Sequence, residues 1–207
     1  MAIADNNRST RTLYSDPSCA SCHRVRVVVQ EKQIKVTIED ITVGNWPEDV
    51  VAANPSGVGP TLIDRDLVLF DSQIIMEYFE DRFPHPALLP ADPAARAQIR
   101  LTLHRIDRDW YSLLNNTSGS EKTRIAKLKK TLREDLTVIA PLFSASEFFM
   151  SNDFSLLDCS LAPLLWRLAS WNIKLPDKAK SVTEYAERIF ARESFQASLS
   201  EAEKGMR

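Results

Sequence analysis

The stretch from Asn54 to Phe83 constrains the fold of this chain more than any other segment. Its sequence predicts a turn, two short strands joined by a tight turn, and a helix that Asp71 and Ser72 open. Pro60 stands directly before the first strand and lacks the amide needed for a ladder hydrogen bond. We therefore expect Pro60 at the start or edge of a strand, where the cis form is one option. The polar pair at the helix start is typical of a cap or of a ligand site.

The residues before this stretch complete a recognisable order of elements. Hydrophobic periodicity predicts a strand over 11–14, a helix over 22–32 and a half-buried strand over 34–41. Together with residues 54–83, these segments give the order strand, helix, strand, strand, strand, helix. This order predicts an α/β thioredoxin-like domain.

The pattern changes after Phe83, where four prolines follow within ten residues. Such a run precludes a regular helix or a central strand. We therefore predict a thioredoxin-like N-terminal domain over 9–86 and an all-helical C-terminal domain over 92–207. In the second domain, apolar spacing predicts a long amphipathic helix over 93–115 and a closing helix over 193–206.

Charge and composition argue against several classes of protein. The 26 Lys and Arg residues are balanced by 28 Asp and Glu residues, for a formal net charge of −2, so no direct nucleic-acid binding is expected. The most apolar stretch, 154–171, contains Asp158 and Arg167, which favours a buried helix over a membrane span. No signal peptide and no disulfide framework are visible, so we expect a cytoplasmic protein.

A C-x-x-C motif, Cys19 and Cys22, lies between the first predicted strand and helix. A helix N-terminus stabilises a thiolate, and Arg24 and Arg26 add positive charge nearby. Cys19 is therefore a candidate nucleophile and Cys22 a candidate resolving thiol. Two inert thiols on a turn, or an adventitious metal contact, are the alternatives. No metal site is predicted, because no second Cys or His pair has matching spacing.

Prolines flank His85 on both sides. Pro84 and Pro86 each fix their own φ and restrict the preceding residue, so the segment is stiff. Stiffness lowers the entropy cost of binding a partner. The pattern alone predicts either a rigid interdomain linker or a preformed binding turn.

The opening stretch resembles the glutathione-binding half of the glutathione transferase superfamily. In that fold a cis-proline turn and an acid–serine pair face the start of helix 1, which implicates Gly59, Pro60, Asp71 and Ser72. From about residue 8 to 207 the chain also resembles the stringent starvation protein A family. The most specific segments are DSQIIMEYFEDRFPHPALLP, LHRIDRDWYSLLN, FSLLDCSLAPLLWRL and FARESFQASLSEAE.

This second resemblance implies a homodimer that binds RNA polymerase holoenzyme near the housekeeping sigma factor. It implies a shift of promoter choice in stationary phase, starvation and acid stress, with no transferase activity and no cofactor. The glutathione-site positions would then be vestigial. The family's surface pocket implicates Phe83, Pro84, His85 and Pro86 in partner binding. Dimer contacts are expected around 67–78 and 96–111.

Two features depart from the family pattern. Gly59 stands where valine usually precedes the cis-proline, and glycine loosens that loop. The pair Cys19 and Cys22 is not a family hallmark, although omega-like and glutaredoxin-like relatives place a catalytic cysteine at this helix start. The alternative function is therefore a glutathione-dependent thiol transferase or reductase. A catalytically silent dimer that pairs with a related subunit is a third hypothesis.

Overall fold

The computed structural model describes residues 11–42, 45–54, 57, 59–115 and 121–207. The first residues of the predicted N-terminal domain, 9–10, and part of the turn before Pro60 lie outside these ranges. The described chain divides into two compact units. One comprises the chain up to Pro86 together with Ala197–Gly205, and the other comprises Ala87–Gln196 with Met206–Arg207.

The first unit is built on a four-stranded mixed sheet. Its strands lie in the order β2 (Thr37–Asp40), β1 (Thr12–Ser15), β3 (Thr61–Asp64) and β4 (Leu67–Phe70). β1 runs parallel to β2 and antiparallel to β3, which pairs antiparallel with β4. Parallel pairing of β1 and β2 requires a crossover, which the intervening helix supplies.

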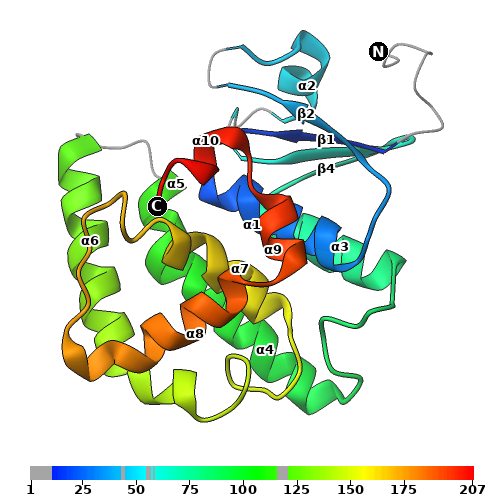
Figure 1. The fold of residues 1–207 in the computed structure, drawn as a ribbon. Helices are drawn as coiled ribbons and strands as arrows, with labels where there is room; N and C mark the ends of the chain where they lie inside the picture. Colours follow the sequence, from blue (N-terminus) through cyan, green and yellow to red (C-terminus); the bar gives the residue numbers. More distant parts are fainter. Residues whose placement is uncertain (1–10, 43–44, 55–56, 58, 116–120) are drawn as a thin grey trace. The chain divides into compact units, whose positions relative to one another are not determined.

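Three helices pack on this sheet: α1 (Ala20–Glu31), α2 (Glu48–Ala53) and α3 (Ser72–Arg82). Figure 1 shows α1 and α3 together on one side of the sheet and α2 on the other. The apolar core between α1, α3 and the sheet is fully buried and includes Leu13, Val25, Val28, Leu62, Ile75 and Phe79. This arrangement confirms the predicted thioredoxin-like domain.

The end of the chain differs from the expected closing helix. It forms two short helices, α9 (Glu193–Ser198) and α10 (Glu201–Lys204). Ser200 begins α10 with a capping box that Glu203 completes, which explains the break. The segment Ala197–Gly205 clusters with the first unit, although the sequence analysis placed it in the helical domain. Its Glu203 carboxylate pairs with Arg26 of α1 at 2.6 Å.

The second unit is all-helical, as predicted. Its elements are α4 (Pro93–Ile106), a π-helical turn η1 (Asp107–Tyr111), α5 (Ser112–Asn115), α6 (Glu121–Val138), the 3-10 helix η2 (Ala140–Ser144), α7 (Leu156–Trp166), the 3-10 helix η3 (Asp177–Ala179), α8 (Lys180–Phe190) and most of α9. The predicted long helix is thus continuous from Pro93 but widens into a π turn at Asp107. Among the helices of the described ranges, none is long and apolar enough to cross a membrane.

Helix α7 forms the core of this unit, and every one of its residues is buried. Ser155 caps it and Asp158 completes the capping box. Asp158 also accepts hydrogen bonds from the Phe149 amide at 2.9 Å and the Tyr185 hydroxyl at 2.5 Å. These four bonds, counting those from Ser155, satisfy a carboxylate that is 0% exposed.

Candidate functional site

The Pro-His-Pro turn lies at the surface where α3 ends. Phe83 leaves helical geometry at φ −127° and ψ 81°, as expected for a residue that precedes a proline. Pro84, His85 and Pro86 are exposed, whereas Phe83 is half-buried. The His85–Pro86 peptide bond is cis. The turn therefore presents an imidazole between two proline rings.

A buried lysine supports this turn from the inside of the first unit. The Lys32 side chain is 0% exposed, and its Nζ lies 2.6 Å from Oε2 of Glu80, whose side chain is 3% exposed. The same Nζ donates to the carbonyl of Phe83 at 2.7 Å and to that of Pro86 at 2.6 Å. An ammonium has three protons, and these three partners account for all of them. Lys32 thus fixes both ends of the turn.

A second cluster holds the Phe83 ring. The Arg11 guanidinium lies 4.8 Å from the ring centroid, within the range of a cation–π contact. Arg11 Nε pairs with Oδ2 of Asp64 at 2.6 Å, and the Tyr78 hydroxyl donates to the same oxygen at 2.8 Å. Burial, together with the Asp64 carboxylate, raises the pKa of Tyr78, so the hydroxyl remains a donor. The turn is therefore held by side chains as well as by its own prolines.

The thiol pair lies at the start of α1, at the other end of that helix from Lys32. Cys19 occupies the N-cap position and is partly exposed, whereas Cys22 is fully buried, and both are free thiols. A hydrogen bond from Cys22 lowers the pKa of Cys19 to about 6. Burial, with the bond and charge of Cys19, raises the pKa of Cys22 well above its ordinary value. Near neutral pH, Cys19 is a thiolate and Cys22 keeps its proton.

Two of the glutathione-site positions have structural partners. Asp71 caps α3, and its Oδ1 accepts from the amides of Gln73 at 2.8 Å and Ile74 at 3.4 Å. The Ser72 hydroxyl is buried and accepts from Arg24 Nε at 2.9 Å and from Arg24 Nη2 at 2.6 Å. The carboxylate and the hydroxyl that would meet glutathione are thus already hydrogen-bonded within the unit.

The other two positions form the turn before β3. Gly59 has a φ of 78°, a left-handed conformation in which an L side chain would be strained. Pro60 is buried and directly precedes β3. Among the described residues the one cis peptide bond is His85–Pro86, so Pro60 does not take the cis form that the sequence left open as one option.

Sequence reasoning missed a buried polar cluster on α1. The His23 side chain, next to Cys22, is 0% exposed. Its Nδ1 lies 3.3 Å from Oε1 of Glu203, and its Nε2 lies 2.9 Å from the Ser198 hydroxyl. Arg26 donates to the Ser198 carbonyl at 3.0 Å and to Glu203 at 2.6 Å. These partners are about 175 residues away in sequence, so no local pattern indicates them.

The described residues contain no group of three or more His, Cys, Asp or Glu side chains that could hold a metal ion. The thiol pair and the Pro-His-Pro turn are therefore the two candidate sites of the first unit. They lie at opposite ends of α1 and are assembled from different residues.

Comparisons with known proteins agree with this fold. Residues 13–87 match the family model for the glutathione S-transferase N-terminal domain, and residues 95–193 match that for the C-terminal domain. Among solved structures, glutathione transferase Omega 3C from Trametes versicolor superposes with a TM-score of 0.76 at 23% identity, covering 93% of this chain and 85% of that one. The glutathione transferase-like fold is thereby confirmed.

Curated relatives resolve the family further. The stringent starvation protein A homolog of Histophilus somni is 45% identical over 203 residues, which cover 97% of this chain and 95% of that protein. The homolog of Pasteurella multocida (strain Pm70) is 45% identical over 201 residues, covering 96% and 94%. Identity at this level over nearly the whole length shows that the chain belongs to the stringent starvation protein A family.

Proposed function

We propose that this protein is a transcription regulator that binds RNA polymerase holoenzyme near the housekeeping sigma factor. In this proposal it acts in the cytoplasm during stationary phase, starvation and acid stress, and it has no transferase activity. Membership of the stringent starvation protein A family supports the proposal. The observation that carries it is the exposed turn over Phe83–Pro86, held from inside by Lys32.

The physical argument for this turn as a partner-binding surface is preorganisation. Ordering a flexible side chain on binding costs about 0.5–1.5 kcal/mol, in addition to the cost of ordering backbone. Here Lys32 fixes two backbone carbonyls and Arg11 stacks on Phe83 before any partner arrives. His85 then offers a nitrogen donor or acceptor between two apolar rings. Such a surface suits recognition of a folded protein.

We propose that transferase activity is absent because the side chains at the glutathione-site positions already hydrogen-bond to other parts of the protein. The Ser72 hydroxyl accepts two hydrogen bonds from Arg24, and the Asp71 carboxylate accepts two helix amides. Glutathione would have to compete with these buried or short-range bonds for the same oxygens. We therefore propose that this protein uses no cofactor.

We also propose a homodimer, because apolar side chains are exposed on the elements expected to form its interface. Leu67 and Phe70 of β4 are 39% and 45% exposed, and Ile74 of α3 is 52% exposed. In the second unit, Leu101 of α4 is 54% exposed. Large apolar side chains exposed on the expected interface elements of each unit support this proposal. A second copy of the chain would remove these side chains from water.

The decisive experiment measures binding to purified RNA polymerase holoenzyme by biolayer interferometry. We expect the wild-type protein to bind and the P84A/H85A/P86A variant to lose at least tenfold in affinity. Pro141→Ala, an exposed proline of the second unit, serves as the matched control and should bind as the wild type does. Equal binding by the triple variant, with unchanged promoter output in transcription assays, would refute the role of the turn.

A second candidate function rests on the lowered pKa of Cys19. The Cys19 thiolate would attack a mixed disulfide between a substrate and glutathione, expelling the substrate thiolate, which then takes up a proton. Cys22 would lose its proton and attack the Cys19–glutathione disulfide, releasing glutathione thiolate and leaving a Cys19–Cys22 disulfide. Two further glutathione molecules would reduce that disulfide. Turnover of a glutathionylated peptide that disappears in Cys19→Ser would support this function, and no turnover in the wild type would end it.

A further inference from the structure

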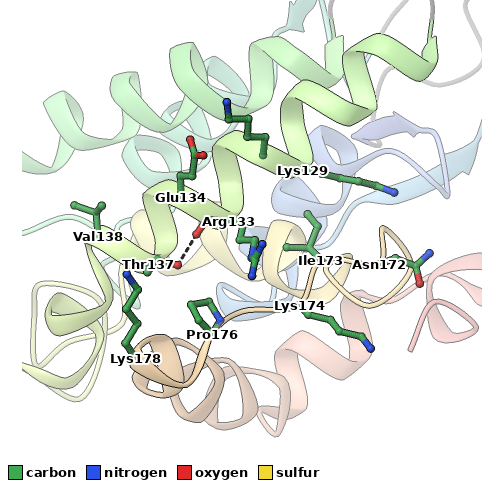
Figure 2. Close-up of a pocket in the computed structure, with 11 residues that line it drawn as sticks. Lys129, Arg133, Glu134, Thr137, Val138, Asn172, Ile173, Lys174, Pro176 and Lys178 are labelled. Atoms are coloured by element: carbon green, nitrogen blue, oxygen red, sulfur yellow. Dashed lines mark hydrogen bonds between the residues drawn. The ribbon is translucent and has the colours of Figure 1, made fainter.

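The second unit contains a basic cavity that the proposed function does not use. It has a volume of about 750 Å³ and lies between α6 and the segment Asn172–Lys178. Its lining consists of Lys129, Lys130, Arg133, Glu134, Thr137, Val138, Asn172, Ile173, Lys174, Pro176 and Lys178. In Figure 2, Arg133 projects from α6 toward Pro176 and Ile173, and Lys178 reaches from the opposite side toward α6.

Cations dominate this lining. The lining residues carry four lysines, one arginine and a single carboxylate, that of Glu134, which gives a formal charge of +4. Within the described ranges, none of the five cations forms an ion pair. By contrast, the buried or half-buried cations Arg11, Arg26 and Lys32 each pair with a carboxylate. The cavity therefore concentrates uncompensated positive charge in a protein whose net charge is −2.

Like charges in a concave site repel one another, and the low-dielectric walls focus their field. This repulsion opposes folding unless an anion occupies the site. The same field raises the local concentration of anions and accelerates their binding. Two walls from separate parts of the chain supply the cations, so a ligand between them would meet positive charge on both sides.

The wall formed by Asn172–Lys178 is held in place by backbone hydrogen bonds. The amide of Ile173 donates to the Leu168 carbonyl at 2.8 Å, and that of Asn172 donates to Ala169 at 2.9 Å. Ile173 is 8% exposed and anchors the segment in the core. The cavity is therefore formed before any ligand binds, which lowers the cost of binding.

We propose that this cavity binds a small polyanion: a phosphorylated metabolite with two or more phosphate groups on an apolar or ring-bearing body. The volume lies in the range of small-molecule sites. The Arg133 guanidinium can grip a phosphate with two hydrogen bonds, while the lysines act as point charges. Ile173, Pro176 and Val138 provide the apolar contact for the body of the ligand.

A nucleic-acid strand is the competing ligand, and the lining disfavours it. Sites for single strands combine positive charge with aromatic side chains on which bases stack. No aromatic residue is found among the described residues that line this cavity. The site therefore supplies charge for phosphates without a stacking surface for a strand of bases.

Isothermal titration calorimetry tests this inference with two probes, inorganic tripolyphosphate and ATP. We expect sub-millimolar binding of both that weakens steeply with added salt, and at least tenfold weaker binding by R133Q/K174Q. Lys127→Gln removes an exposed cation from the same helix outside the cavity and should bind as the wild type does. If the double variant does not fold by circular dichroism, Lys174→Gln alone, on the loop, should lose about threefold or more.

Three results would overturn the proposal. One is no measurable heat at millimolar probe with the wild-type protein. Another is an equal loss in Lys127→Gln, which would show diffuse surface charge rather than a site. The third is tighter binding of a labelled single-stranded oligonucleotide with the same dependence on Arg133 and Lys174, which would assign the cavity to nucleic acid. None of these outcomes bears on polymerase binding by the turn, so the two proposals fail separately.

Discussion

Replacing Lys32 with methionine tests the proposed support of the Pro-His-Pro turn. The change keeps the length of the side chain but removes the ammonium that contacts Glu80, Phe83 and Pro86. Glu80 would then remain a buried carboxylate after losing its contact with the Lys32 ammonium. Removing one partner of a buried ion pair typically costs about 3–5 kcal/mol. We expect the free energy of unfolding of the first unit to fall by that amount.

A double variant separates this electrostatic penalty from the loss of the turn contacts. In K32M/E80L both charges are gone, and apolar replacement of a buried pair is often neutral or stabilising. The carbonyls of Phe83 and Pro86 still lose their donor, at about 0.5–1.5 kcal/mol for each hydrogen bond. The free energy of unfolding of the double variant should therefore be about 1–3 kcal/mol lower than that of the wild type and higher than that of the single variant.

The measurement must report on the first unit alone, because a chain of two compact units need not unfold in one two-state transition. Hydrogen exchange of peptides from α1 and α3 along a urea titration meets this requirement. In parallel, the affinity of each variant for RNA polymerase holoenzyme should fall, including that of the double variant. A loss below 1 kcal/mol in Lys32→Met, or wild-type affinity in K32M/E80L, would refute the reasoning.

Three further predictions follow from other contacts. The rate of Cys19 alkylation by iodoacetamide should rise with pH as the thiolate forms and be half-maximal near pH 6, and Cys22→Ala should shift this midpoint upward because the hydrogen bond is lost. A midpoint near pH 9 in the wild-type protein would contradict the lowered pKa of Cys19. Asp158→Ala should lower the free energy of unfolding of the second unit by about 3 kcal/mol or more in urea titrations, since four donors lose their acceptor; a change within 1 kcal/mol would count against it. Phe70→Asp should convert a dimer to a monomer by light scattering, whereas Val51→Asp, equally exposed on α2, should not; an unaltered mass for Phe70→Asp would disprove the interface.

The sequence predicts those features whose signals are local. The capping box of Ser155 and Asp158 lies within four residues, so its two hydrogen bonds can be inferred from the residue types alone. The run of prolines after Phe83 marks the end of a helix for a similarly local reason. Alternation over 34–41 likewise separates the more buried side chains, Ile34, Val36 and Ile38, from the exposed Lys35, Thr37 and Glu39, although β2 itself begins at Thr37 and contains no fully buried residue.

The features that the sequence does not predict depend on distant partners. The residues over 193–206 do form helices, but the Ser200 hydroxyl accepts a hydrogen bond from the Glu203 amide and starts a new helix at that point. The Glu203 carboxylate finds Arg26, which no spacing rule connects with it. The interrupted helix and the buried His23 therefore have one cause, the packing of the last residues on α1. The basic cavity was also missed, because a run of cations on one helix is usually a solvated face.

The cations of α1 engage a side chain of the predicted glutathione site and also support the Pro-His-Pro turn. Burying a cation costs several kcal/mol unless it is paired. Arg24, Arg26 and Lys32 are 2%, 4% and 6% exposed. Their partners are, in order, the Ser72 hydroxyl, the Glu203 carboxylate of the C-terminal segment, and Glu80 with the two turn carbonyls.

Each of these pairings fixes a different part of the unit to the same helix. The pairing with Ser72 uses the hydroxyl that a glutathione site would need, and the pairing of Lys32 fixes the exposed turn. The proposed loss of ligand binding and the proposed stiffening of the turn would therefore have a common structural source in α1. On this argument, Arg24→Met should free the Ser72 hydroxyl without altering polymerase affinity. Lys32→Met should lower polymerase affinity and leave the Ser72 hydroxyl bonded to Arg24. Glutathione binding by Arg24→Met, measured calorimetrically, distinguishes the two roles, and lost polymerase affinity in that variant would show that the roles are not separable.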